Sequence, residues 1–283
     1  MPTKPFKPDG LAGMNGGEPI KGRSLWQDAR RRLFQNKAAV VSMVFLATIV
    51  IMAIFAPYLS PWAFDDPDWG YDFPGPPNAE LKHWFGTDGN GRDLFVRTLY
   101  GARISLLVGV IATSVSLLIG VTYGATAGFV GGRTDNIMMR IVDILYSLPF
   151  MFFVILLMVI FGRNIFLIFV ALGAVEWLTM ARIVRGQALS VKKKEFIEAA
   201  HAVGVSGGKI ITRHIIPNVL GPVIVYMTLT IPQVILTESF LSFLGLGVQE
   251  PLTSWGVLIS EGAKQMESAP WMLIFPALFL AIT

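Results

Sequence analysis

Long apolar runs separated by polar segments dominate this sequence. Ala38–Tyr58 contains no charged residue, and its length suits the ~20-residue helix that crosses a hydrocarbon core ~30 Å thick. Similar runs extend from Ile104 to about Gly124, from about Ile144 to Phe161 and from Ile165 to about Met180. We therefore expect these runs to form membrane-spanning helices.

The two runs nearest the C-terminus have the features of interrupted spans. Val219–Gly247 is longer than one span requires and contains Pro232, Glu238 and a Gly-rich end. Broken helices occur in membranes where surrounding protein satisfies the freed backbone groups, so we expect a fifth span followed by a broken or re-entrant piece. Trp271–Thr283 is apolar but too short to cross. Either it inserts only partly into the membrane, or it starts a sixth span and the natural chain continues beyond Thr283; we favour the second interpretation.

Glycines and short turns indicate how the spans pack. Gly120, Gly124 and Gly128 recur every four residues, which places them on one helix face where another backbone can approach closely. The turn at Gly162–Asn164 is so short that the third and fourth spans should form an antiparallel hairpin.

The N-terminal residues are polar and basic. Residues 1–23 mix Gly, Pro and Lys without periodicity, which is typical of a disordered tail. Ser24 and Gln27 fit a capping box, and Arg30–Arg32 lie opposite an apolar face. This pattern predicts an amphipathic helix over 24–37 at the membrane surface. A solvated basic linker is the alternative.

Composition agrees with lipid as the solvent and narrows the chemistry. The 283 residues are 53% hydrophobic and 15% charged, whereas soluble domains carry about 25% charged residues. Cysteine is absent, so disulfides and cysteine metal sites are excluded. The apolar run from Ala38 is longer than the apolar core of a signal peptide, and we expect it to remain as an anchor.

The distribution of charge predicts the orientation of the chain. Residues 182–218 hold seven basic and two acidic residues, whereas residues 59–103 hold four basic and seven acidic residues. Basic residues concentrate on the cytoplasmic side. We therefore expect 59–103 to be an external loop and 182–218 to be a cytoplasmic one. We also expect six spans in all, with both termini in the cytoplasm.

The cytoplasmic loop has an internal pattern of its own. Ser190 can cap a short helix that Gly204 stops, and a second amphipathic segment extends from about Lys209 to Pro217. One face of the first helix is apolar: Phe196, Ala199, Ala200 and Val203. A short helix with small residues on one face suits insertion into a groove on a partner.

At this point a family resemblance is visible. Glu198-Ala199-Ala200, followed by Gly204 and by Ile216-Pro217, resembles the EAA loop of bacterial ABC-importer permeases. His214 stands where many of these permeases have Ile, so His214–Asn218 resembles the peptide and nickel branch.

Four other segments resemble the C-subunit family of oligopeptide permeases. The similarity covers most of residues 22–283. The matching segments are Gly22–Arg32, Phe85–Leu106, Met180–Gln187 and Glu238–Gly247.

The resemblance implies an all-α integral membrane protein with the type I ABC-importer permease fold, about six transmembrane helices over 38–283 and a cytoplasmic coupling loop. It implies a permease subunit of the bacterial inner membrane that pairs with a paralogous permease, two cytoplasmic ATPase subunits and an external peptide-binding protein. The chain itself would be no enzyme and would hold no cofactor, and nucleic-acid binding is not indicated. The coupling residues would be Glu195, Glu198, Ala199, Ala200, Gly204, His214, Pro217 and Asn218.

Charged residues inside apolar runs are candidates for the transport pathway. A charge at a helix centre costs about 2.5–3.5 kcal/mol on insertion scales, so Glu176 and Glu238 could face a water-lined path or pair with neighbouring helices. Arg140 and Asp143 are three residues apart and are expected to form a local ion pair. Gly204–Ile210 lacks the spacing and the hydroxyl of a phosphate loop.

Other functions remain open at this point. A dipeptide or nickel ABC permease is the near alternative. An ion-coupled secondary transporter is the distant one. An intramembrane enzyme would need a nucleophile, base or metal constellation, and the sequence offers none.

Overall fold

The computed structural model describes residues 31, 33–162 and 165–283. Within those ranges every regular element is helical. The chain divides into two compact units, Met1–Thr48 and Ile49–Thr283. The predicted tail over 1–23, most of the predicted surface helix over 24–37 and the turn at 163–164 lie outside the described residues.

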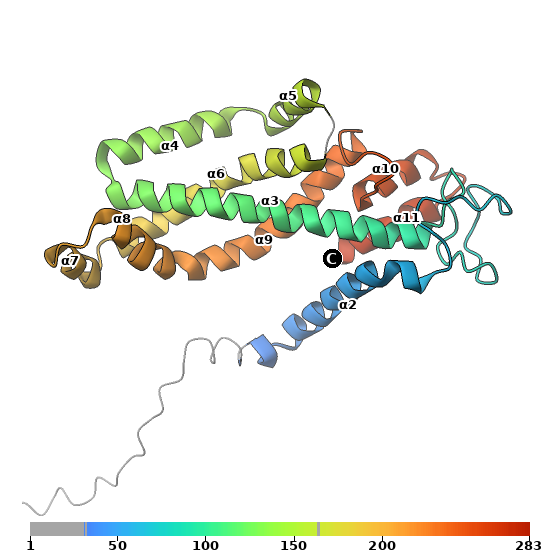
Figure 1. Cartoon of the computed structure of the whole chain (residues 1–283), viewed down its shortest axis with the longest axis horizontal. Coiled ribbons are helices and arrows are strands. Elements are labelled where there is room, and N and C mark those ends of the chain that lie inside the picture. The colour runs from blue at the N-terminus through green and yellow to red at the C-terminus, as the bar shows by residue number, and fades with distance from the viewer. Residues whose placement is uncertain (1–30, 32, 163–164) are drawn as a thin grey trace, which may run out of the picture. The chain divides into compact units, whose positions relative to one another are not determined.

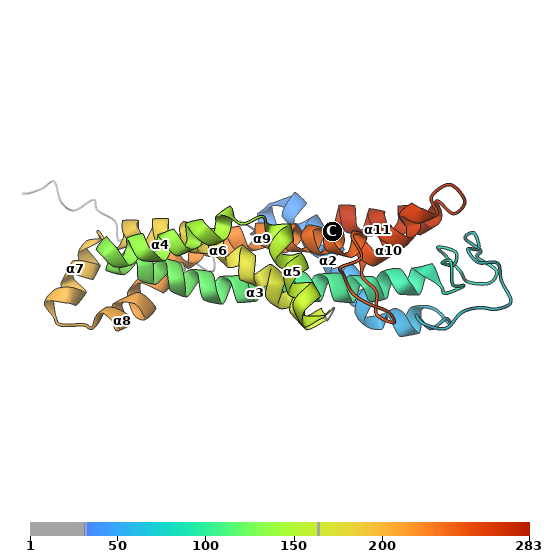
Figure 2. The ribbon, with the colours of Figure 1, turned by 90° about the horizontal axis from the view of Figure 1, so that it is seen from above.

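Figure 1 shows the order of the helices. α2 (Lys37–Leu59) crosses the boundary between the two units. The second unit is built on three long helices, α3 (Leu94–Val130), α6 (Ile165–Val191) and α9 (Ile216–Phe243). Both ribbon views show these three side by side (Figure 2).

Shorter helices complete the second unit. Its two ends differ in content: α7 and α8 lie at one end, and α10, α11 and the loop over 60–93 lie at the other (Figures 1 and 2). The shorter elements are α4 (Gly132–Ser147), α5 (Phe150–Phe161), α7 (Glu195–Ala202), α8 (Gly207–Ile210), the π-helical turn η1 (Ile211–Ile215), α10 (Trp255–Lys264) and α11 (Trp271–Ile282).

Among the described residues, three helical stretches are long and apolar enough to cross a membrane. They are Lys37–Leu59, Leu94–Val130 and Gly207–Phe243, and a fourth is possible if α4 and α5 count as one bent span. α6 adds a helix of 27 residues. The total of six spans stays a prediction.

The second span begins earlier than the sequence pattern predicted. α3 starts at Leu94 rather than at Ile104, so the last part of the expected 59–103 loop is helical. The Asp93 side chain caps this helix by accepting a hydrogen bond from Val96 N at 2.8 Å. Arg97 is polar but buried, which is why polarity alone misplaced the helix start.

The expected third span is not continuous. α4 ends at Ser147, Leu148 is extended (ψ 135°), and α5 follows Pro149. The two helices are bent by 83°. Proline has no N–H and pushes the preceding residue out of the helical region, so Pro149 accounts for the break.

The glycine spacing in α3 correctly predicted a close helix contact. A Cβ at Gly120 would lie 2.6 Å from Met180 Cβ, and one at Gly128 would lie 2.8 Å from Ala188 Cβ. At Gly124 it would meet the Ala181 carbonyl oxygen. All three glycines therefore lie against α6 at distances that leave no room for a side chain.

The C-terminal part differs from the expected pattern in two places. α9 passes Pro222 and Pro232 without ending and stops at Phe243, before Gly245 with φ +77°. The expected polar loop over 248–270 contains α10, which begins at Trp255. The Trp255 side chain is buried, and its indole N–H donates to Thr98 O at 3.1 Å.

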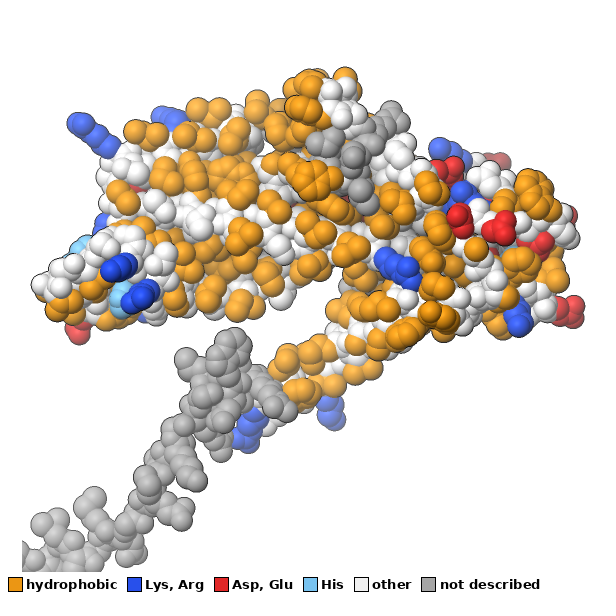
Figure 3. Space-filling model, in the orientation of Figure 1, with side chains coloured by type: hydrophobic (Ala, Val, Ile, Leu, Met, Phe, Trp, Pro, Cys, Tyr) orange, Lys and Arg blue, Asp and Glu red, His pale blue; other side chains and the backbone are white. Residues whose placement is uncertain are grey.

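The loop over 60–93 is fastened by buried charges. Asp88 pairs with Arg92 at 2.8 Å and with Arg97 at 3.1 Å, and Arg92 also reaches Glu250 at 3.0 Å. Acidic side chains gather at this end, whereas Lys, Arg and His side chains surround α7 at the other (Figure 3). Within the described ranges, no group of three or more His, Asp or Glu residues could hold a metal ion.

A histidine stands at the centre of the same loop. His83 lies between Asp93 at 2.8 Å and Asp68 at 3.2 Å, and its ring stacks between those of Trp62 and Tyr71. Burial raises the pKa of Asp93, whereas a backbone N–H from Gly70 lowers the pKa of Asp68. The two carboxylates that flank this histidine thus have different proton affinities.

Candidate functional site

Two short helices, α7 and α8, and the π-helical turn η1 connect α6 to α9. α6 continues to Val191, so Ser190 lies inside it and donates to Gly186 O at 3.3 Å. Ser190 therefore does not cap α7, contrary to the sequence-based expectation. Glu195 and Glu198 occupy the first turn of α7, where the helix dipole favours acidic side chains.

Gly204 ends α7, as the sequence predicted. Its φ is +78°, a left-handed conformation that suits glycine. The N–H groups of Gly204 and Val205 donate to His201 O and Ala200 O, both at 3.0 Å, which is the Schellman pattern. No described heavy atom lies within 4 Å of a Cβ added at Gly204. A side chain there would meet backbone strain rather than a clash.

The apolar residues of α7 divide between two faces. Ala200 is buried together with Ile197, and both belong to a cluster that includes Phe129 of α3 and Ile210 of α8. The other expected members of the stripe point outward. Ala199 is exposed, and Phe196 and Val203 are 40% and 78% exposed. Ala200 thus attaches α7 to the unit rather than belonging to its outer face.

The residues before α9 form one continuous helical segment. The π-helical turn Ile211–Ile215 precedes Pro217, which is exposed in the first turn of α9. Because proline lacks an N–H and crowds the preceding turn, a locally widened helix accommodates it. The expected segment from about Lys209 to Pro217 is therefore helical and continues directly into α9. Asn218 Nδ2 donates to His214 O at 2.8 Å, and the His214 ring lies 6.4 Å from that of Phe196.

The C-terminal end of α3 supports α7. The Phe129 ring stacks on His201 with centroids 5.7 Å apart and planes inclined by 2°. Lys192 Nζ lies 3.4 Å from Val130 O and over the Phe129 ring. Sequence patterns do not indicate this role for Phe129, because it is one apolar residue among many in a long helix.

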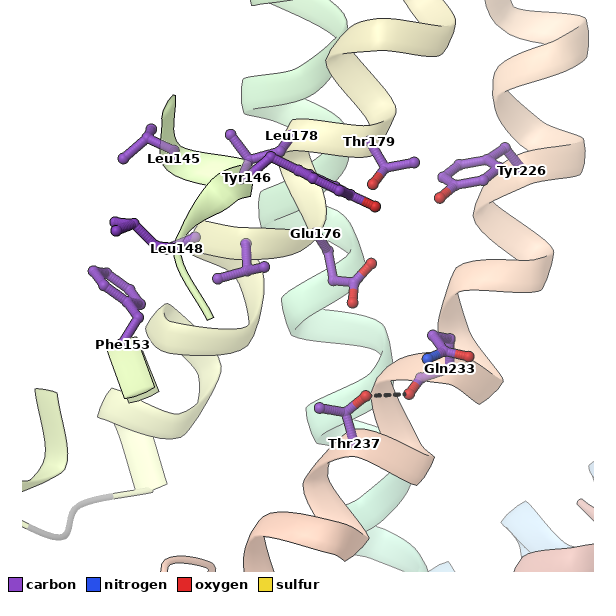
Figure 4. Close-up of a pocket in the computed structure, with 12 residues that line it drawn as sticks. Leu145, Tyr146, Leu148, Phe153, Glu176, Leu178, Thr179, Tyr226, Gln233 and Thr237 are labelled. Atoms are coloured by element: carbon purple, nitrogen blue, oxygen red, sulfur yellow. Dashed lines mark hydrogen bonds between the residues drawn. The ribbon is translucent and has the colours of Figure 1, made fainter. Parts of the chain in front are cut away.

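A cavity of about 520 Å³ lies beside α6 and α9. The bend between α4 and α5 lines its other side through Tyr146 and Leu148. The Glu176 carboxylate points into the space between α6 and α9, with Tyr226 and Gln233 across from it (Figure 4). The two pathway candidates therefore lie in different places, because Glu176 lines this cavity and Glu238 does not.

Glu238 lies in a buried polar cluster instead. It is fully buried and accepts a hydrogen bond from Ser242 Oγ at 2.7 Å. Ser105 Oγ of α3 lies 3.4 Å from the same carboxylate, and it accepts from Trp255 N at 3.2 Å. The cluster joins α3, α9 and α10. These contacts support a structural role for Glu238, with hydrogen bonds satisfying a carboxylate that is costly to bury.

Two ion pairs attach α4 to α6. Asp143 pairs with Arg182 at 2.9 Å, not with Arg140 as expected. Asp135 accepts two hydrogen bonds from Arg185, each at 2.6 Å, and such bidentate pairs are among the stronger ones. The prediction for Asp143 considered spacing along one helix only, whereas its partner lies on another.

Comparison with known proteins identifies relatives over almost the entire chain. Residues 120–283 match the family model described as "Binding-protein-dependent transport system inner membrane component", and residues 24–78 match "N-terminal TM domain of oligopeptide transport permease C". The chain is 60% identical to the oligopeptide transport system permease protein OppC of Haemophilus influenzae, over 93% of this chain and 85% of the relative.

Two further relatives extend the comparison. The OppC protein of Escherichia coli K12 is 59% identical over 93% of this chain and 87% of its own length. The dipeptide transport system permease protein DppC of Bacillus subtilis is 49% identical over 92% of this chain and 81% of its own length.

Proposed function

The chain belongs to the family of binding-protein-dependent transport system inner membrane components, and from that premise we propose that it forms part of the pathway for oligopeptide uptake in an ATP-driven importer. The observation that carries the proposal is the 60% identity, over nearly the whole chain, to a relative named as an oligopeptide permease. A dipeptide permease is the second candidate, because a relative of that name is 49% identical.

In this proposal the chain works with four other components. A paralogous permease completes the pathway, two cytoplasmic ATPase subunits hydrolyse ATP, and an external binding protein delivers the peptide. The chain itself carries no catalytic residue. We expect ATP hydrolysis only when the ATPase subunits are present, and turnover by the isolated chain would contradict the assignment.

We assign coupling to the ATPase subunits to α7. Its outer face carries Phe196, Ala199 and Val203, all exposed, and a helix with such a face suits an apolar groove. Its inner face contacts the end of α3 through Ile197 and Ala200. A displacement of α7 would therefore be transmitted to the long helices as a rigid-body movement.

The same proposal fixes an orientation. Both termini and α7 face the cytoplasm, the loop over 60–93 is external, and residues 24–37 lie on the inner membrane surface behind a polar tail over 1–23. Because the chain has no cysteine, single cysteines at Glu80 and Ser206, both exposed, report on this directly. An impermeant thiol reagent should label the first and not the second in intact cells. Labelling of Ser206→Cys from outside would show that the proposed orientation is wrong.

Transport by the complete complex tests the function. In vesicles loaded with ATP, uptake of a peptide of three or more residues should require the binding protein and stop when ATP is withheld. Uptake confined to dipeptides would favour the second candidate. Uptake driven by an ion gradient without ATP would reject both and favour a secondary transporter.

A further inference from the structure

The cavity beside α6 and α9 holds a carboxylate, that of Glu176, for which the described residues supply no counter-ion. Its volume of about 520 Å³ lies within the range of ~300–1,000 Å³ typical of small-ligand sites. Within the described residues, no ion pair or hydrogen bond engages the Glu176 side chain. An ionisable group inside a membrane helix is costly unless a partner or water meets it, so a cation entering the cavity would stabilise the charged form of Glu176.

The cations of α6 are already engaged. Arg182 stacks over the Tyr146 ring, 4.2 Å from its centroid, and its guanidinium pairs with Asp143. Arg185 makes its two hydrogen bonds to Asp135. Both carboxylates belong to α4, so the two arginines hold α4 in place and do not neutralise Glu176.

The remaining polar groups of the cavity suit a small cation with several donors. Tyr226 and Thr179 lie on one side of Glu176, and Gln233 lies further along α9 (Figure 4). The Thr237 hydroxyl is committed to Gln233 O at 2.8 Å. A primary ammonium group has three donors, which the Glu176 carboxylate and neighbouring hydroxyl and amide oxygens can accept. An aromatic ring in the wall also attracts a cation.

We propose that this cavity binds the N-terminal ammonium group of a peptide in transit, with Glu176 as its counter-ion. The inference rests on the proposed function, because it takes a peptide as the cargo. The α-amino group has an ordinary pKa of about 7.7–8.0 and is therefore mostly protonated at neutral pH. Every unmodified peptide carries this group, so one carboxylate can serve substrates of any sequence.

Charged thiol reagents test the cation preference without transport. In the assembled complex carrying Thr179→Cys, a cationic methanethiosulfonate should react faster than an anionic one of similar size. Adding Glu176→Gln should lower the ratio of the cationic to the anionic rate about tenfold, the equivalent of one modest charge interaction. Glu176→Asp keeps the charge and should leave this ratio nearly unchanged. At Ser268→Cys, on the exposed surface, the ratio should not respond to either change. An unchanged ratio at Thr179→Cys would overturn the proposal.

Uptake by the complete importer tests the ligand. Glu176→Gln should lower uptake of a free-amine tripeptide about tenfold, Glu176→Asp should restore most of it, and Glu267→Gln, at an exposed glutamate, should have no effect. If Glu176→Gln removes the reagent preference but leaves uptake normal, the site lies off the pathway and the proposal is wrong. If the unaltered complex takes up no peptide with ATP, the proposed function fails, and peptide is excluded as the ligand while the reagent ratio still reports the charge of the cavity.

Discussion

Different interactions stabilise the two ends of the Ile49–Thr283 unit. At the end with the 60–93 loop, buried charges pair with one another, as Asp88 does with Arg92 and Arg97. At the end with α7, apolar contacts and ring stacking attach a short helix to the end of α3. One end pairs buried charges within the unit, whereas the other leaves an apolar face uncovered.

This difference indicates where each end should tolerate change. Removing a member of a buried ionic network leaves other charges unpaired in a low-dielectric interior, so the cost is large. A substitution on an exposed apolar face removes little packing from the unit. We therefore expect stability to depend on the first end and coupling on the second.

The largest effect on stability should come from Asp88→Asn. Asp88 is buried and faces both Arg92 and Arg97, and breaking a buried pair costs about 3–5 kcal/mol. Thermal unfolding of the purified complex should shift to a much lower temperature. Asp66→Asn, at an exposed carboxylate in the same loop, is the matched control. Equal unfolding temperatures for the two variants would show that the network contributes little.

The close contact of the α3 glycines with α6, between the two ends, should be the feature next most sensitive to substitution. Gly124→Val would force a side chain against the Ala181 carbonyl and Val184, and overpacking costs typically about 1–3 kcal/mol. Gly186→Ala is the control in the facing helix α6, because no described heavy atom lies within 4 Å of a Cβ there. Thermal unfolding checks both. A Gly124 variant as stable as the Gly186 variant would contradict the close packing of α3 on α6.

Gly204→Ala should have a smaller effect, because it meets strain without a clash. A left-handed conformation costs a non-glycine residue about 1–2 kcal/mol, and φ at Gly204 is +78°. Gly208→Ala, close by but with an ordinary φ, should be nearly silent. The measurements are thermal unfolding and peptide uptake. If both variants behave alike, the turn after α7 does not depend on its left-handed residue.

The sequence predicted features that depend on local spacing. The glycines of α3 share one face whatever the tertiary structure, and they do meet α6. Gly204 ends α7 for an equally local reason. The break of the third span at Pro149 was not predicted although its cause is local, because the effect of a proline depends on context: α9 continues through Pro222 and Pro232.

Features that depend on distant partners were not predictable. The spacing of Arg140 and Asp143 suggested a pair, yet Asp143 reaches Arg182 on another helix. Ala200 belonged to the expected outer stripe of α7, but the end of α3 buries it. The cavity at Glu176 combines four helices. No single stretch of sequence contains enough of it to be recognised.

The smallest effect on stability should come from the outer face of α7, and it sharpens the comparison most. Val203 is 78% exposed, and surface substitutions away from special features stay within about 0.5 kcal/mol, so Val203→Ser should leave thermal unfolding unchanged. Ala199→Asp, on the same exposed face, should do likewise.

Ala200→Asp is a poorer probe of coupling, because Ala200 is buried against the rest of the unit and the variant would also destabilise α7. If the outer face docks on an ATPase subunit, a buried unpaired carboxylate at Ala199→Asp should lower peptide uptake at least tenfold while folding stays normal. Lys193→Ala, at an exposed residue just before α7, should keep both stability and uptake. Normal uptake by Ala199→Asp, at normal levels of the assembled complex, would mean that this face is not the coupling surface.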